Sequence, residues 1–157
     1  MKPIRAAIMG AGAVSRQHAK AYLNNPHCTV VGVCSRRQES ARALAEELGG
    51  ECEVYPNYEA LVADDRVNTV SICTPNYQHA ALAIQAARAG KHLVLEKPVG
   101  ITQEEVHAVR QAVREAGVLS VVSFILRWNP MIQTLRALLD QGAIGQITYA
   151  ECDYWHG

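Results

Sequence analysis

The sequence predicts an α/β fold built on a doubly wound parallel sheet. Short continuous apolar runs alternate along the chain with segments in which apolar residues recur at helical spacing. A glycine-rich turn follows the first of these runs. The chain has 157 residues, of which 49% are hydrophobic and 19% charged, so it can bury a sizeable core. This length fits one domain plus part of a second.

The first half of the chain predicts three strand–helix units. Predicted strands cover 4–10, 29–35 and, as a weak short strand, 53–55. The first helix, 13–24, ends before Pro26 because the residue preceding a proline disfavours helix. The second helix is indicated by an apolar stripe and ends at a glycine pair: Ala41, Leu44, Ala45, Leu48, Gly49 and Gly50. Asn57 is able to cap a small helix through Leu61.

The second half repeats the pattern. Predicted strands cover 67–73, 92–95 and 118–126, and we expect the last of them to be largely buried. A helical stripe ends at Gly90 and consists of Ala80, Ala83, Ile84 and Ala87. Thr102 and Glu105 form a T-x-x-E capping box ahead of a further helix with Val106, Val109 and Val113 on one face. The sequence therefore predicts six strands.

The last part of the chain predicts the start of a second α/β domain. A helix after Pro130 runs to Gly142, and residues 147–155 then alternate as in one strand of a different sheet. No further strand follows, and an unpaired strand edge tends to associate with other strands. We therefore expect either a homo-oligomer that pairs through this strand or a domain that is otherwise missing. The expected boundaries are 1–126 and 127–157.

Composition excludes several classes of protein. Fifteen Lys and Arg balance fifteen Asp and Glu, so no global field draws the chain to nucleic acid or a membrane surface. Five cysteines without a C-x-x-C pair argue against a disulfide framework and a structural metal site, and favour a reducing cytoplasm. The basic, apolar start faintly resembles a secretory signal, but its glycines have a better use. There is no run of roughly 18 apolar residues that would span a membrane.

The glycine turn predicts a dinucleotide site of the Rossmann type. Gly10, Ala11, Gly12, Ala13 and Val14 lie where the first strand turns into a helix. Gly10 permits the tight turn, and Gly12 lets the backbone approach a pyrophosphate held by free N–H groups at the helix start. Ser15 replaces the usual third glycine and is small enough for close packing. The alternative is a plain turn between core elements.

The end of the second strand favours NADP over NAD. An NAD-binding fold usually places Asp or Glu there, about 20 residues beyond the glycines, to bind the ribose 2′-hydroxyl. Here the residue is Ser35, followed by Arg36 and Arg37. Two guanidinium groups are able to bind a 2′-phosphate, which a carboxylate would repel. The alternative is a pair of solvated arginines at a helix start.

Two further motifs follow the fourth and fifth predicted strands, at the edge where ligands of open α/β sheets bind. The first contains Thr74, Pro75, Asn76 and His79. Thr74 and Asn76 offer hydrogen bonds to a ribose or nicotinamide, although Asn76 is equally suited to cap a helix and His79 to pack. The second motif is Glu96-Lys97-Pro98. A lysine there is able to hold a substrate hydroxyl and move its proton, especially if partial burial lowers its pKa, and the proline can fix the turn in the cis isomer.

These motifs together resemble the Gfo/Idh/MocA family of NAD(P)-dependent sugar and polyol oxidoreductases. The resemblance covers nearly the whole chain, including C-T-P-N-Y-Q-H at 73–79, A-G-K-H-L-V-L-E-K-P at 89–98, R-W-N-P at 127–130 and G-A-I-G-Q-I at 142–147. It implies that the glycine turn binds pyrophosphate and that Ser35, Arg36 and Arg37 meet the adenosine ribose. Thr74, Asn76, Glu96 and Lys97 would surround the nicotinamide ribose, and Arg127 and Trp128 would lie near the nicotinamide. Pro75 and His79 would also be cofactor-binding residues. Lys97 would also be catalytic.

The resemblance also implies what this chain lacks. In this family a second α/β domain supplies most substrate contacts, a catalytic histidine and the usual dimer surface. His156 is too early to match that histidine. We therefore expect the cofactor-binding portion of an oxidoreductase, cut short, that binds cofactor without efficient turnover. The alternative is a non-catalytic module that senses NAD(P), and the sugar or polyol substrate is left open.

Overall fold

The computed structural model describes residues 3–49, 52–153 and 155. The chain divides into two units, Met1–Ser123 and Phe124–Gly157, and each is described by itself. Gly50, Tyr154 and His156, which entered the sequence-based expectations, lie outside the described residues.

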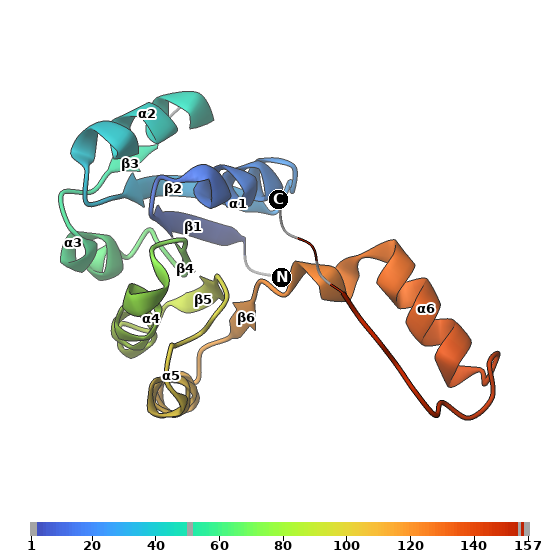
Figure 1. Ribbon diagram of the computed structural model, residues 1–157. Helices are drawn as coiled ribbons and strands as arrows, with labels where there is room; N and C mark the ends of the chain where they lie inside the picture. The colour runs from blue at the N-terminus through green and yellow to red at the C-terminus, as the bar shows by residue number, and fades with distance from the viewer. Residues whose placement is uncertain (1–2, 50–51, 154, 156–157) are drawn as a thin grey trace. The chain divides into compact units, whose positions relative to one another are not determined.

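The first unit contains a six-stranded, wholly parallel sheet (Figure 1). Its strands are β1 Ile4–Met9, β2 Cys28–Cys34, β3 Glu53–Val54, β4 Thr69–Ile72, β5 His92–Leu95 and β6 Ser120–Val122. The spatial order is β3-β2-β1-β4-β5-β6. The chain thus builds outward from β1 in one direction and then, from β4, in the other. The predicted doubly wound fold is confirmed, and its switch point lies between β1 and β4.

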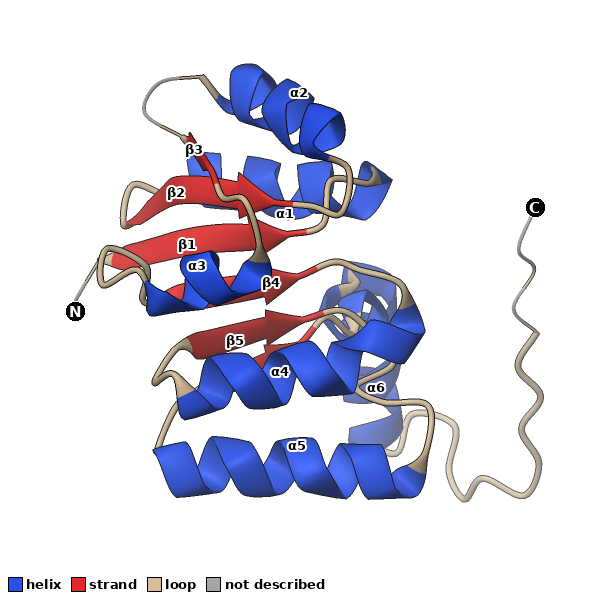
Figure 2. Ribbon diagram, turned by 90° about the vertical axis from the view of Figure 1, so that its left-hand side faces the viewer, coloured by secondary structure: helices blue, strands red, loops and turns tan. Residues whose placement is uncertain are grey.

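Helices cover both faces of the sheet (Figure 2). They are α1 Ala13–Leu23, α2 Gln38–Leu48, α3 Tyr58–Ala63, α4 His79–Arg88 and α5 Gln103–Ala116, with a short 3₁₀ helix η1 Asn76–Gln78. Successive β1 residues point to opposite faces, so Ala6 and Ile8 pack with α1 while Ala7 joins the cluster formed with α3, α4 and α5. Among the described residues, no helix combines the length and apolar character needed to cross a membrane.

The predicted helix starts are confirmed by their caps. The Ala60 N–H donates to Asn57 Oδ1 at 2.8 Å, and the Glu105 N–H donates to Thr102 Oγ1 at 3.2 Å. In a capping box the Glu105 carboxylate would accept the backbone N–H of Thr102. Here it accepts the N–H of Ile101, one residue earlier. Local side-chain chemistry thus fixes where these helices begin.

The sixth strand is shorter and more exposed than predicted. The predicted strand 118–126 contains only β6, Ser120–Val122, and residues from Ile125 onward form a 3₁₀ helix instead. Val121 is 50% exposed and Leu119 73% exposed, so the expectation of a largely buried strand was wrong. The cause is the strand order, because β6 is an edge strand that pairs only with β5.

The second unit contains η2 Ile125–Trp128 and α6 Pro130–Asp140. The predicted helix after Pro130 is confirmed, with Asn129 Oδ1 accepting the Met131 N–H at its start. Residues 147–153 and 155 are described, and none of them is in a strand, so the prediction of a strand over 147–155 was wrong for these residues. A strand needs a hydrogen-bonded neighbour, and alternation of side chains does not supply one.

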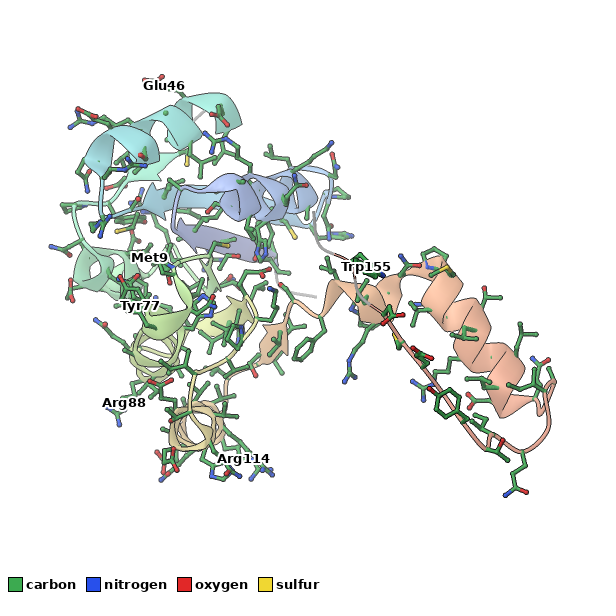
Figure 3. All side chains as sticks on the ribbon, in the orientation of Figure 1. Met9, Glu46, Tyr77, Arg88, Arg114 and Trp155 are labelled. Atoms are coloured by element: carbon green, nitrogen blue, oxygen red, sulfur yellow. The ribbon has the colours of Figure 1, made fainter. Side chains whose placement is uncertain are left out.

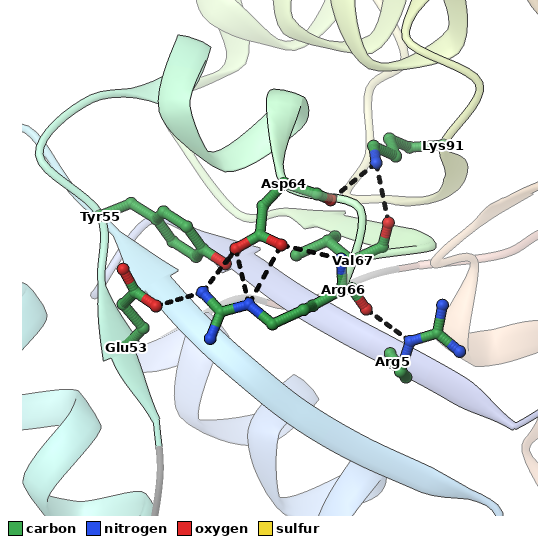
Figure 4. A network of polar contacts seen from close by, with 7 residues as sticks. All are labelled: Arg5, Glu53, Tyr55, Asp64, Arg66, Val67 and Lys91. Carbon is green, nitrogen blue, oxygen red and sulfur yellow. Dashed lines mark hydrogen bonds and ion pairs between the residues drawn. The ribbon is translucent and has the colours of Figure 1, made fainter.

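A polar network joins β3 to the segments that precede β4 and β5 (Figure 4). The Arg66 guanidinium pairs with the carboxylates of Asp64 and Glu53, and the Tyr55 hydroxyl donates to Asp64 Oδ2 at 2.8 Å. The buried Lys91 donates to the carbonyl oxygens of Asp64 and Val67 at 2.8 and 2.9 Å. These bonds hold the segment between α3 and β4 against β3 and β5, which gives the network a structural role.

We expect Asp64→Asn to destabilise the fold in a pH-dependent way. The hydrogen bond from the Arg66 side chain holds the pKa of Asp64 well below its usual range. Because this folded pKa is depressed, the stabilisation is fully present above the unfolded pKa of about 3.9 and is lost progressively as pH falls from there through the folded pKa. At pH 7 the melting temperature should fall by about 2 to 4 °C, allowing for screening of the exposed guanidinium. Thermal unfolding followed by circular dichroism measures this.

The matched control is Asp65→Asn, which removes the same formal charge from an exposed neighbour. It should leave the melting temperature within about 1 °C of the wild-type value at pH 7 and at pH 2.5. An equal loss for Asp64→Asn at pH 7 and at pH 2.5 would show that the carboxylate charge contributes nothing.

Candidate functional site

A groove of about 660 Å³ lies at the carboxyl ends of β1, β2 and β4. This is the switch point of the sheet, where the helices that follow β1 and β4 pack on opposite faces. Ten of the predicted cofactor-binding residues line it: Gly10, Ala11, Gly12, Ala13, Val14, Ser35, Arg36, Arg37, Thr74 and Pro75. Figure 3 labels Met9 and Tyr77, which line it as well. Three motifs that are far apart in the sequence therefore meet at one groove.

Glycine has a different structural effect at each of the two positions of the turn. Gly10 has a φ of +114°, and a Cβ placed there would meet the carbonyl oxygen of Cys73 at 2.5 Å. A side chain is thus excluded at Gly10 by the protein itself. Gly12 is in extended backbone, and a Cβ there would meet nothing within 4 Å. The space over Gly12 is open on the side of the groove.

The start of α1 suits an anion. Ser15 is fully buried and its hydroxyl accepts the N–H of Gly12 at 3.1 Å, so a serine at this position does pack closely. Ala13 and Val14 are in the first turn, where backbone N–H groups have no acceptor within the helix. The first turn contains no acidic residue. The positive end of the helix dipole is therefore left available for a phosphate.

The charged side chains of the groove are all basic. Arg36 and Arg37 are exposed and follow the end of β2, and none of the described residues that line the groove is acidic. Two further lining groups are thiols. Burial raises the pKa of Cys34 to about 11 and that of Cys73 to about 12, so both remain neutral near pH 7. The groove is therefore electropositive.

Thr74 offers an unused hydrogen-bonding group at the groove. Within the described part of the chain, its hydroxyl oxygen is buried and has no hydrogen-bond partner. Buried polar groups are usually paired, so an unpaired one at a groove is a mark of a missing ligand atom. The open space over Gly12, the helix start and this hydroxyl together fit a dinucleotide.

The lysine motif lies at the same edge but outside the lining of this groove. Glu96 and Lys97 follow β5, and the Lys97–Pro98 peptide bond is cis, as the sequence allowed. Lys97 is exposed, so it lacks the partial burial that the sequence-based hypothesis considered for it. Asn76 is exposed at the start of η1 and also lies outside the lining.

His79 packs between two loops. It is 1% exposed, and its ring nitrogens lie 2.6 Å from the carbonyl oxygen of Pro98 and 2.8 Å from that of Thr74. The packed histidine, the alternative left open by the sequence, therefore describes this position. Both ring nitrogens face these carbonyl oxygens, so His79 joins the loop of Thr74 to the turn of Pro98.

Arg127 and Trp128 belong to the second unit. The Arg127 guanidinium lies over the Phe124 ring, 5.6 Å from its centroid, and Trp128 is 71% exposed. Their expected place near the nicotinamide stays a prediction.

Sequence reasoning missed part of the groove wall. Residues from the start of α2, the loop before α3 and η1 also line it: Ser40, Pro56, Asn57, Tyr58, Tyr77 and Gln78. Tyr77 and Gln78 lie inside the motif at 73–79 and could have been inferred from it. Ser40 lies on α2, three residues after Arg37. Pro56, Asn57 and Tyr58 follow β3, whose pairing with β2 brings them to the groove, and the cap predicted at Asn57 did not indicate this position.

Comparison with known proteins identifies the family. The oxidoreductase family with an NAD-binding Rossmann fold, the Gfo/Idh/MocA family, matches residues 4–124. The chain belongs to this family. The oxidoreductase domain is 34% identical over 144 residues to an inositol 2-dehydrogenase of Rhizobium meliloti, with 92% of this chain covered. It is 33% identical over 146 residues, again with 92% covered, to a D-glucoside 3-dehydrogenase of Escherichia coli.

Solved structures of related proteins share the fold of this chain. An NAD-binding protein from Listeria innocua superimposes with a TM-score of 0.85 at 32% identity over 92% of this chain and 42% of its own. A 3-ketoreductase from Actinomadura kijaniata, solved with NADP and TDP-benzene, gives a TM-score of 0.85 at 29% identity over 92% of this chain and 44% of its own. The chain spans 43% and 41% of the lengths of the inositol and glucoside dehydrogenases.

Proposed function

We propose that this chain is the cofactor-binding portion of an NADP(H)-dependent dehydrogenase that acts on a sugar or polyol in the cytoplasm. The observation that carries the proposal is the electropositive groove, in which the glycine turn, the start of α1, Arg36 and Arg37 meet without an acidic residue among the described lining. The relatives named for inositol and glucosides indicate the class of substrate.

Different residues of this chain would bind different parts of the cofactor. The turn at Gly12 and the start of α1 would hold the pyrophosphate, and Arg36 and Arg37 the 2′-phosphate. Thr74 would accept or donate a hydrogen bond toward the nicotinamide ribose. The bound nicotinamide supplies hydride transfer, while Lys97 would hold the substrate hydroxyl and move its proton.

The two parts of the chain would have separate tasks. Residues 1–126 would form the dinucleotide-binding domain, and 127–157 would lead into the part of the protein that contacts substrate. Arg127 and Trp128 would then approach the nicotinamide from that side. On this proposal the chain by itself binds cofactor and turns over substrate poorly.

A fluorescence titration of the chain with NADPH, and in parallel with NADH, tests the proposal. We expect tighter binding of NADPH, because two charge-assisted hydrogen bonds reach the 2′-phosphate. The double variant Arg36→Ser/Arg37→Ser should lose about 10- to 100-fold in NADPH affinity and less than about 2-fold in NADH affinity. Binding of neither cofactor would contradict the proposed function.

The matched control changes two exposed arginines of α5, Arg110→Ser/Arg114→Ser. It removes the same charge from the chain, so it separates a local contact from a change in the overall field. Equal losses of NADPH affinity in both double variants, or equal affinity of the wild type for the two cofactors, would overturn the assignment of the 2′-phosphate site.

A further inference from the structure

His18, on the second turn of α1, bridges three strands of the sheet. Its Nδ1 lies 2.6 Å from the hydroxyl of Ser71 on β4, and its Nε2 lies 2.9 Å from Glu96 Oε1 after β5. Ser123, after β6, places its hydroxyl 3.5 Å from the same Nε2. The side chains of His18 and Glu96 are only 10% and 16% exposed. The groove does not include His18, and none of the roles assigned above uses it.

With an ionised Glu96 and a neutral imidazole, the contacts of His18 fit one of its two tautomers. An ionised Glu96 carboxylate only accepts, so Nε2–H must donate to it. Nδ1 of a neutral ring then accepts, and the fully buried Ser71 hydroxyl donates. In this arrangement each hydrogen bond of the set Ser71–His18–Glu96 has one donor and one acceptor. This arrangement holds the Glu96 carboxylate in one direction.

The backbone around Glu96 is fixed independently. The Glu96 N–H donates to the carbonyl oxygen of Ile72 at 3.1 Å, and the Ser123 N–H donates to that of Leu95 at 2.9 Å. The strands thus set where Glu96 lies, while His18 sets where its carboxylate points. Because His18 and Gly12 lie on and before the same helix, α1 connects the phosphate end of the site to the Glu96–Lys97 turn.

We propose that His18 is a positioning residue that holds the Glu96 carboxylate in one direction, and that it thereby favours the oxidised cofactor over the reduced one. This inference rests on the proposed function, which brings the nicotinamide to Glu96. Oxidised nicotinamide carries a positive charge and reduced nicotinamide is neutral. A fixed carboxylate in a partly buried site therefore attracts only the oxidised form.

Calorimetric titration with NADP⁺ and NADPH at pH 8 tests the inference. His18→Leu removes both ring nitrogens and should weaken NADP⁺ binding about 5- to 10-fold while changing NADPH binding less than about 2-fold. Glu96→Gln should show the same selective loss. The double variant should lose no more than Glu96→Gln alone, because His18 acts through Glu96. His18→Gln, whose amide is able to donate to the carboxylate, should recover part of the affinity.

A control and a second readout keep the outcomes distinct. His107→Leu changes an exposed histidine of α5 and should alter neither affinity. The imidazole ¹⁵N spectrum of the wild type should show Nε2 of His18 protonated and Nδ1 unprotonated, with the Nε2 signal moving in Glu96→Gln. Equal losses for both cofactors, additive losses in the double variant, or the opposite tautomer would overturn the inference while leaving the proposed function intact. A wild type that binds neither cofactor would overturn both.

Discussion

Replacing Gly12 with alanine is expected to weaken NADPH binding by about 100-fold, which is about 2.7 kcal/mol and comparable to one lost charge-assisted hydrogen bond. A Cβ at this position would meet no protein atom within 4 Å, and the backbone is extended, so the fold accepts the methyl group. The methyl group would instead occupy the open space through which, on the proposed function, a pyrophosphate would approach the start of α1. The free energy of unfolding should change by less than about 1 kcal/mol.

Gly10→Ala provides the contrast within the same turn. Its φ of +114° and the approach of the Cys73 carbonyl oxygen make a side chain strained whether or not a ligand is bound. We expect a loss of about 1 to 3 kcal/mol in the free energy of unfolding, measured by urea denaturation. If Gly12→Ala lowered stability as much as Gly10→Ala and left NADPH affinity unchanged, the groove would not be the pyrophosphate site.

Lys97→Ala is expected to lower kcat about 10²- to 10⁴-fold in the longest form of the protein that can be expressed, with cofactor affinity nearly unchanged. Lys97 is exposed at the carboxyl edge of the sheet and lies outside the groove lining, so its loss should disturb neither the fold nor the phosphate contacts. The measurement pairs steady-state turnover of the sugar or polyol substrate with an NADPH titration.

The control for this variant is Lys20→Ala, an exposed lysine near the end of α1, which should leave both quantities unchanged. The same pair of measurements separates the dehydrogenase from a sensor that binds NAD(P) without using it. Turnover that survives in Lys97→Ala would remove Lys97 from the chemistry. A protein with tight NADPH binding and no turnover of any polyol would favour the sensor.

The elements that the sequence predicted well are those governed by local chemistry. Asn57 and Thr102 start their helices through bonds to residues three positions on, and the conformation at Gly10 follows from its place between a strand and a helix. The strand–helix order was readable for the same reason, because apolar spacing is a property of neighbouring residues. These signals were sufficient to predict the glycine turn and both arginines, while the family was predicted from the resemblance of the motifs.

The errors arose where a neighbour distant in sequence decides the outcome. Val121 belongs to a sequence that reads as a buried strand, yet it is half exposed because β6 is an edge. The segment 147–155 alternates as a strand does, but the described part of it has no strand beside it. The pattern of a single segment contains no information on which segment will lie next to it.

The sequence by itself therefore determined the fold class, the turn that prepares α1 for an anion and the basic character of the groove. Only the tertiary structure decided that His79 joins two loops and that His18 bonds Ser71 and Glu96, its partners being 53 and 78 residues away. A histidine reads the same in the sequence whether it binds a ligand, packs or positions a neighbour. Its role is set by the donors and acceptors that the completed sheet brings within about 3 Å of its ring.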